Sequence, residues 1–258
     1  MLQRMKEIYC YREMLLNLVV KELRARYKGS VLGFFWSFLN PLLMLIVYSV
    51  IFSFLMRTST KNYAMFLFVA LLPWNYLANS VMQGAGSLVY NSSLVKKVYF
   101  PREVLPLAVV SANMVNYLLS LLILVPALLV FRVKLTVALF AFPVVLLLQT
   151  FLVLAMTLLV SIGNVYFRDL EHITGVLITV WFFLTPVLYS AEMMPEKVQK
   201  FFLLNPAAPL IEAYREMFFY GRWPDWKCLG WVAVVNIALF LMSFWIFGRL
   251  QQAVAEEI

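Results

Sequence analysis

The residues of this chain that could carry out chemistry are few and far apart. The only histidine, His172, lies at the edge of an apolar stretch, not deep inside one, where an intramembrane serine protease needs its base. Asp169 and Asp225 both lie in polar connections, whereas a paired-aspartate protease needs both carboxylates within the membrane. No G-x-x-x-x-G-K-[ST] phosphate loop occurs, and Cys10 and Cys228 are too far apart for a metal site. We therefore expect no catalytic residue, metal or cofactor in this chain, which is not predicted to be an enzyme on its own.

One polar segment with a distinctive composition is Asn91–Pro106, N-S-S-L-V-K-K-V-Y-F-P-R-E-V-L-P. It combines two lysines, an aromatic pair and an Arg-Glu step between prolines. Ser92–Val98 suits a short helix, and Pro101 ends the unit because a proline disfavours helical geometry in the residue before it. Two interpretations stay open: a basic turn at the lipid headgroups, or a compact helix that receives movement from a partner subunit.

The elements that position these residues are six long stretches without Lys, Arg, Asp, Glu or His. A helix needs roughly 20 apolar residues to cross a bilayer, and 64% of the chain is hydrophobic. The sequence therefore predicts an all-α integral membrane protein with one membrane domain over residues 1–258, and excludes an ordinary soluble domain. The predicted spans are 32–56, 63–82, 105–131, 138–163, 173–189 and 229–247. Pro41, Pro73 and Pro186 are expected to kink the first, second and fifth of them.

The absence of charge inside these stretches limits the energy source. Transporters driven by protons or sodium usually keep ionisable groups at mid-membrane depth, because those groups carry the coupling ion. None lies in the predicted spans. If the chain moves a solute uphill, the energy is expected to come from outside the membrane segments.

The net charge of +8 is unevenly distributed between the loops. One side carries Arg4, Lys6, Arg12, Lys21, Arg24, Arg26, Lys28, Lys96, Lys97, Arg102, Arg168 and Arg249. The short loops on the other side carry only Arg57, Lys61, Arg132 and Lys134. Because short cytoplasmic loops are enriched in Lys and Arg, both termini are predicted to be cytoplasmic. The basic excess is explained by topology and contact with membrane lipids, and no nucleic-acid partner is expected.

Two segments outside the spans have helical features. Within residues 1–31, helical spacing over residues 8–28 places apolar side chains on one face and polar ones on the other, which predicts an amphipathic helix at the membrane surface. It is either a peripheral anchor or a docking surface. Residues 190–227 hold apolar pieces, Phe201–Leu204 and Met217–Tyr220, that are too short to cross. We expect re-entrant or interfacial helices there, forming an external cap in which Arg215, at shallow depth, pairs with Glu212 or Glu216.

Four motifs resemble one family in its own order. They are G-F-F-W-S-F-L-N-P-L (Gly33–Leu42), K-V-Y-F-P-R-E-V-L-P-L (Lys97–Leu107), R-D-L-E-H-I (Arg168–Ile173) with W-F-F-L-T-P-V-L-Y (Trp181–Tyr189), and L-N-P-A-A-P-L-I-E-A-Y-R (Leu204–Arg215). The chain resembles the permease subunits of bacterial polysaccharide ABC exporters, which export lipid-linked O-antigen, teichoic acid or capsular polysaccharide and belong to the type-2 ABC exporter superfamily.

The resemblance implies a homodimer of six-span subunits in the bacterial inner membrane, bound by two copies of a separate ATPase that holds ATP and Mg²⁺. It places the N-terminal amphipathic helix at the ATPase interface. The coupling segment matches Lys96, Lys97, Tyr99, Phe100, Arg102 and Glu103, and the second cytoplasmic turn matches Arg168 and Asp169.

A glycan crossing the membrane needs polar partners and aromatic surfaces for its apolar C–H faces. The candidate lining consists of Phe34, Trp36, Trp74, Tyr76, Trp181, Phe182, Phe183 and Tyr189. Aromatic residues also gather at membrane interfaces without any ligand, and this alternative stays open. Arg24, Arg26 and Lys28 are candidates for contact with the lipid phosphate, although topology alone also explains them.

The sequence thus predicts the permease subunit of an ATP-driven exporter of lipid-linked polysaccharide. Two alternatives remain. One is a type-2 ABC exporter of a drug or a lipid without a long glycan, and the other is a passive channel or scaffold without an ATPase.

Overall fold

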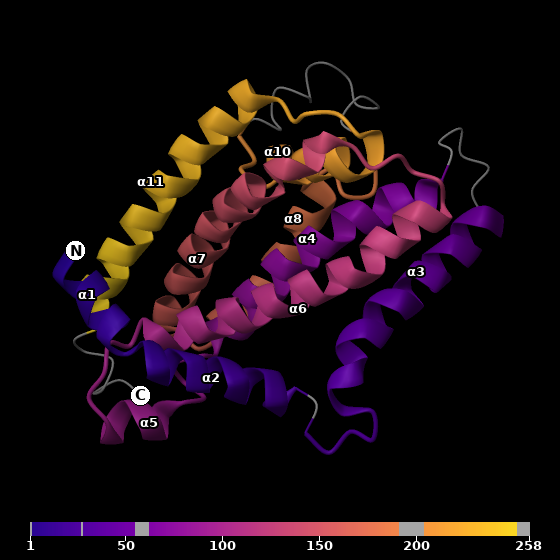
Figure 1. Ribbon diagram of the computed structural model, residues 1–258. Helices are drawn as coiled ribbons and strands as arrows, with labels where there is room; N and C mark the ends of the chain where they lie inside the picture. The colour runs from indigo at the N-terminus through magenta and orange to yellow at the C-terminus, as the bar shows by residue number, and fades with distance from the viewer. Residues whose placement is uncertain (1, 27, 55–61, 191–203, 252–258) are drawn as a thin grey trace.

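The fold is an all-helical bundle in the part of the chain that the computed structural model describes, residues 2–26, 28–54, 62–190 and 204–251 (Figure 1). Five segments are long and apolar enough to cross a membrane. They contain α3 (Trp36–Phe54), α4 (Tyr63–Ala85), α6 (Val104–Val130), α7 (Phe142–Tyr166) and α11 (Trp226–Leu250). Short 3₁₀ turns, η1 (Gly33–Phe35) and η2 (Val137–Ala141), precede α3 and α7. The prediction of an all-α membrane protein is confirmed.

The predicted fifth span has different limits. Helix α8 covers Leu170–Leu184, and its 15 residues correspond to about 22 Å at 1.5 Å per residue. The prediction that this helix reaches Tyr189 is wrong. Thr185 is extended (φ −101°, ψ 137°), because the ring of Pro186 clashes with a helical residue before it. Pro41 and Pro73, in contrast, lie inside α3 and α4.

Helix α4 forms the centre of the bundle and α3 its edge. The share of residues buried in the most apolar window is 83% for α4 but only 11% for the segment containing α3. Helices α3, α6, α7, α8 and α10 all contact α4. Gly84 permits the close approach of α7, since a Cβ atom there would lie 2.2 Å from Thr157 Cγ2.

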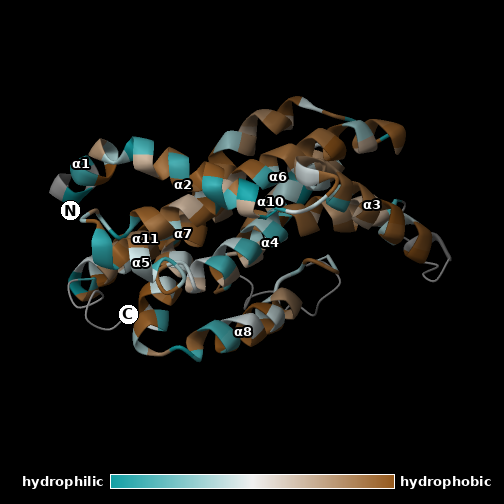
Figure 2. Ribbon diagram, turned by 90° about the horizontal axis from the view of Figure 1, so that it is seen from below, coloured by the Kyte–Doolittle hydropathy of each residue, from teal (hydrophilic) through white to brown (hydrophobic). Residues whose placement is uncertain are grey.

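One end of the bundle carries the polar helices, and we call it the α2 end. Helices α1 (Leu2–Cys10), α2 (Arg12–Ala25) and α5 (Ser92–Lys97) lie there, together with the end of α11. The single N-terminal helix predicted over residues 8–28 is divided at Tyr11 and ends at Ala25. Helix α2 packs along α6 and buries Leu18 and Val19, while its remaining surface mixes charged residues with the exposed Leu16 and Val20 (Figure 2).

The opposite end, which we call the α10 end, is formed by the second half of the 190–227 segment. Helix α10 (Ala208–Arg215) and the π-helical turn η4 (Glu216–Tyr220) contact α4, and α10 also packs on α7 and α11. Arg215 pairs with Glu212 at 3.4 Å, one of the two predicted partners. Its side chain is completely buried, and its shallow depth in the membrane stays a prediction. The predicted piece at Phe201–Leu204 lies outside the described residues except for Leu204.

Candidate functional site

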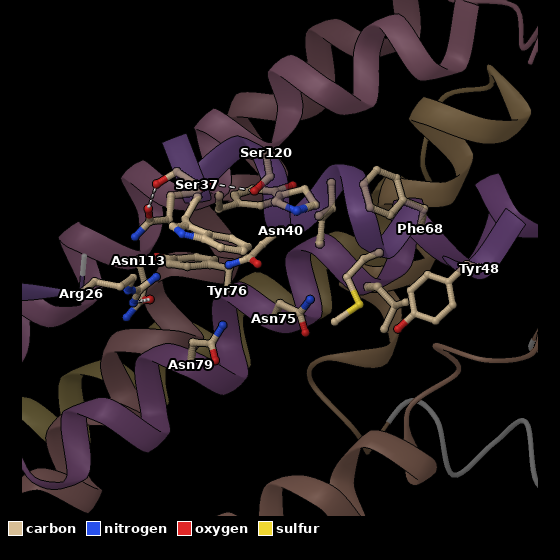
Figure 3. A pocket seen from close by; sticks show the side chains of 17 residues that line it. Arg26, Ser37, Asn40, Tyr48, Phe68, Asn75, Tyr76, Asn79, Asn113 and Ser120 are labelled. Carbon is tan, nitrogen blue, oxygen red and sulfur yellow. Dashed lines mark hydrogen bonds between the residues drawn. The ribbon is translucent and has the colours of Figure 1, made fainter. Parts of the chain in front are cut away.

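A cavity of about 340 Å³ lies between α3, α4 and α6 (Figure 3). We call it the amide cavity because five asparagine side chains line it. Its polar lining consists of Arg26, Ser37, Asn40, Asn75, Asn79, Asn113, Asn116 and Ser120. Its aromatic and apolar lining consists of Trp36, Pro41, Met44, Tyr48, Phe68, Leu71, Leu72, Tyr76 and Tyr117. Its volume is within the range of about 300–1,000 Å³ typical of small-molecule sites.

Helical spacing explains how one face of each helix supplies the amides. Asn75 and Asn79 are four residues apart on α4, and Asn113 and Asn116 are three apart on α6, so each pair lies on one face. Asn40, from α3, closes the space on the third side. Asparagine is costly against lipid and is expected to face protein or a wet cavity. The asparagines therefore identify the faces of α4 and α6 that enclose a polar space.

Arg26 lies at one end of the amide cavity and Tyr48 at the other (Figure 3). One guanidinium nitrogen of Arg26 donates to Gln83 Oε1 at 2.9 Å and to Asn113 Oδ1 at 2.8 Å. Asn113 Nδ2 in turn donates to Gln83 Oε1 at 3.1 Å. The three side chains form a closed network that holds the only charged group of the lining at its rim. Of the three predicted phosphate-binding residues, only Arg26 lines the cavity, whereas Arg24 and Lys28 are exposed elsewhere.

The eight aromatic residues predicted to line a pathway fall into separate groups. Trp36 and Tyr76 line the amide cavity, and the Tyr76 ring stacks on Tyr117 with centroids 5.7 Å apart. Phe34 and Phe183 are exposed. The hydroxyl of Tyr189 donates to the Phe183 carbonyl at 2.8 Å.

The other three aromatics form a packed cluster outside the cavity. Trp74 of α4 meets Trp181 and Phe182 of α8 with ring centroids 5.8 and 5.6 Å apart. Trp181 Nε1 donates to Asn205 Oδ1 at 2.8 Å, which links α8 to the segment before α10. In this chain the cluster packs α4 against α8.

In the predicted coupling segment, residues 96–103, some side chains are exposed on the surface and others are buried in the bundle. Lys96, Lys97 and Tyr99 are exposed, and Tyr99 keeps 90% of its surface accessible. Phe100 and Glu103 are buried. Arg102 donates to the backbone carbonyl of Gln251, so it ties the segment to the end of α11.

Hydrogen bonds join this segment to its neighbours at the α2 end. Lys21 of α2 donates to Asn91 Oδ1 at 2.7 Å, just before α5. Tyr90 donates to Glu171 Oε1 at 2.6 Å, and this bond to a carboxylate raises the pKa of Tyr90. Arg168 and Asp169, exposed in the turn before α8, therefore lie near α5. The two sequence segments predicted to meet a partner thus form one surface with α2.

The asparagines of the cavity were missed in the sequence because only ionisable and aromatic side chains were considered as lining. The available signal was the pairing of Asn at spacings of three and four within apolar stretches. Among the described residues, no group of three His, Cys, Asp or Glu side chains is placed to hold a metal ion.

Comparison with known proteins agrees with these features. The model of the ABC-2 type transporter family matches residues 14–219. The chain belongs to the ABC-2 type transporter family. It is similar to the O-antigen export system permease protein RfbA of Myxococcus xanthus, with 39% identity over 260 residues covering 100% of both chains. It is also similar to the protein of the same name from Klebsiella pneumoniae, with 31% identity covering 95% of this chain and 94% of the relative. The polysialic acid transport protein KpsM of Escherichia coli is 21% identical, covering 92% and 93%.

The family match spans the whole described site. It begins within α2 and ends within η4, so it includes the amide cavity, α5 and the turn before α8. The residues of the amide cavity and of α5 therefore lie within the part of the chain that matches the family.

Proposed function

We propose that this chain is the permease subunit of an ATP-driven exporter that carries lipid-linked polysaccharide across the bacterial inner membrane. The observation that carries this proposal is full-length similarity, at 39% identity, to a protein named as an O-antigen export permease. Relatives named for capsule export and polysialic acid transport cover more than nine tenths of the chain as well. The proposed substrate is a lipid-linked polysaccharide of the O-antigen, capsule or teichoic acid class.

The proposed topology has six crossings, with α8 as the fifth. The N- and C-terminal parts of the bundle meet at the α2 end. Arg4 of α1 packs so closely on Gly248 of α11 that a Cβ atom at Gly248 would collide with its side chain. Helix α7 ends at this same end, where Tyr166 donates to the Leu250 carbonyl at 2.8 Å. Helix α11 starts from the α10 end, so the chain must return there between α7 and α11. Because the chain must return from the α2 end to the α10 end, α8, extended by residues 185–190, is supported as a crossing. The loop charges favour a cytoplasmic α2 end.

The proposed partners are a second copy of this chain and two copies of an ATPase that binds ATP and Mg²⁺. The exposed side chains of Lys96, Lys97 and Tyr99, the turn at Arg168 and Asp169, and the outer face of α2 are proposed to contact that ATPase. Phe100, Arg102 and Glu103 then fix the coupling segment to the bundle. Membership in the ABC-2 family supports this over a passive channel or scaffold.

The proposed substrate contacts are Arg26 for the lipid phosphate and Trp36 and Tyr76 for the glycan. Arg26 is supported by its position at the rim of a cavity whose lining is otherwise uncharged. An exporter of a drug or a lipid without a glycan is the second candidate, and the cavity's polarity disfavours it. Five amides suit a hydroxylated ligand better than an apolar one.

The test is purification from native membranes in mild detergent, with identification of partners and measurement of ATP hydrolysis. We expect a stoichiometric ATPase. Lys97→Glu should lower turnover about tenfold or more, because reversing a charge at an interface commonly costs over 1.4 kcal/mol. Lys134→Glu, exposed in the loop between α6 and η2, is the matched control and should keep turnover. Surface glycan in a permease-deletion strain complemented with each variant should follow the same order.

A preparation without an ATPase, or equal turnover in both lysine variants, would contradict the assignment of this surface. Unchanged surface glycan in the deletion strain would contradict polysaccharide export itself. Lys97 is a sharper probe than Arg102, because reversing Arg102 would also break its bond to the Gln251 carbonyl.

A further inference from the structure

Three amides of the cavity have no hydrogen-bond partner among the described residues. Asn40, Asn75 and Asn79 are exposed and line the cavity, and their side chains make no hydrogen bond within the described part of the chain. Asn113 and Asn116 are already engaged, since Asn113 accepts from Arg26 at 2.8 Å and Asn116 accepts from Ser37 at 3.2 Å. Figure 3 shows Asn40, Asn75 and Asn79 along the cavity, between Arg26 and Tyr48. The unused hydrogen-bonding capacity of the lining is therefore supplied by α3 and α4.

The chemistry of this place favours a neutral, hydroxyl-rich ligand. Each primary amide offers one carbonyl acceptor and two N–H donors, and a sugar hydroxyl both donates and accepts. The lining contains no carboxylate and no lysine, so it gives no ionic preference apart from Arg26. The stacked rings of Tyr76 and Tyr117 are only 2% and 4% exposed, so the aromatic surfaces of the lining that remain accessible to the apolar face of a sugar are those of the half-buried Trp36 and Tyr48.

Arg26 adds a second, anionic specificity at the rim. Its guanidinium is held by two amide oxygens, from Gln83 and Asn113, rather than by a carboxylate. The bonds use a single guanidinium nitrogen, Nη2, so the positive charge stays uncompensated. A fixed and uncompensated guanidinium is suited to a phosphate oxygen. The cavity therefore offers a phosphate contact at its rim and a sugar contact farther inside.

We propose that the amide cavity binds the first sugar of a lipid-linked glycan, the neutral ring directly attached to the phosphate, through Asn40, Asn75 and Asn79. The proposal rests on the proposed function and specifies which part of that substrate a single subunit recognises. The phosphate lies at Arg26, and the ring lies against the three amides and the half-buried Trp36. Recognition of the junction between phosphate and sugar makes the site independent of the length of the glycan.

The test is equilibrium binding to the full-length chain with its ATPase in nanodiscs. The probes are polyprenyl pyrophosphate carrying one neutral sugar, the same lipid without a sugar, and the free monosaccharide. The wild type should bind the glycosylated lipid most tightly. Asn75→Ala and Asn79→Ala should each weaken that binding about three- to tenfold, the worth of one hydrogen bond, and leave the unglycosylated lipid unaffected. Arg26→Gln should weaken the binding of both lipids.

The controls separate loss of recognition from loss of structure. Met82→Ala changes an exposed residue of the same helix that does not line the cavity, and it should leave both lipids unaffected. Alanine favours helix over asparagine, so the two α4 variants should fold. Asn40→Ala, on α3, repeats the test from another helix.

The inference is overturned if the asparagine variants change neither lipid's affinity, or both equally, or if the free monosaccharide binds as tightly as the glycosylated lipid. A wild-type complex that exports glycan but binds both lipids equally would overturn this inference alone. A complex that neither binds lipid nor couples ATP hydrolysis to export would overturn the proposed function together with it.

Discussion

Gln251 Nε2 donates a 2.8 Å hydrogen bond to Glu103 Oε1, joining the end of α11 to the start of α6. Glu103 is 1% exposed, and Arg102 beside it bonds the Gln251 carbonyl. The last described residue of the chain is thus attached to the coupling segment. Movement of that segment is expected to reach α11 as well as α6.

Glu103 should make stability depend on pH. Burial raises its pKa above the ordinary value, against the smaller opposing effects of the Gln251 bond and Arg4, while Glu7 adds to the rise. Because the folded state holds this proton more tightly, its stabilisation is complete below the unfolded pKa of about 4.3 and is lost as pH rises through the folded pKa.

Glu103→Gln keeps an oxygen acceptor for Gln251 and removes the titration. We expect the thermal midpoint of the wild type in detergent, relative to this variant, to fall as the pH rises above the unfolded pKa of about 4.3 and through the higher folded pKa. Each unit of difference in pKa between folded and unfolded chains corresponds to about 1.4 kcal/mol. If the thermal midpoints of the two proteins change with pH in parallel, the Glu103 carboxyl has the same pKa in the folded and unfolded chain.

Gly84→Ala should destabilise the contact between α4 and α7. The added Cβ would lie 2.2 Å from Thr157 Cγ2, and such overpacking costs about 1–3 kcal/mol, which exceeds the gain of up to about 1 kcal/mol in helix propensity. Thr157→Ser removes the colliding methyl group and should restore the thermal midpoint in the double variant. Gly175→Ala on α8, with no atom within 4 Å of the new Cβ, is the control and should be neutral or slightly stabilising.

Arg215→Met should lower stability severely. Arg215 donates to the carbonyls of Pro186, Val187 and Tyr189, and its loss leaves the buried Pro186 and Val187 acceptors unpaired at about 1–3 kcal/mol each. Arg222→Ala removes an exposed ion pair of 3.5 Å with Glu216 and should cost under about 1 kcal/mol. Equal thermal midpoints for the two variants would mean that the Arg215 bonds do not hold the α10 end together.

Asn205→Ala should loosen the α10 end from α8. Asn205 accepts from Trp181 Nε1 at 2.8 Å, donates to Thr185 Oγ1 at 2.9 Å and accepts from the Ala207 amide at 3.1 Å. Loss of the three bonds should cost about 2 kcal/mol, measured by thermal unfolding. Trp181→Phe removes one of them, so the double variant should lose less than the sum of the single losses. Full additivity would exclude coupling between these residues.

Much of the fold follows from local constraints in the sequence. Bilayer thickness sets the length of an apolar stretch, and backbone groups in lipid must bond within the helix. The long helices therefore appear close to the predicted ranges, such as Val104–Val130 for 105–131. The proline at 186 already indicated that α8 ends near Leu184. The prediction of a helix to Tyr189 instead followed the length of the apolar stretch.

The sequence by itself determined the membrane class, five of the six predicted spans and, through four ordered motifs, the family. Only the tertiary structure decided which faces of the helices meet. The spacing of the asparagines marks one polar face on each of α4 and α6, but nothing local indicated that Asn40, Asn75 and Asn113 share one cavity. The same holds for Arg26, which differs from Arg24 and Lys28 only through the partners that distant helices α4 and α6 bring to it. Sites built from several helices depend on packing between residues far apart in the chain, and the structure supplies that packing.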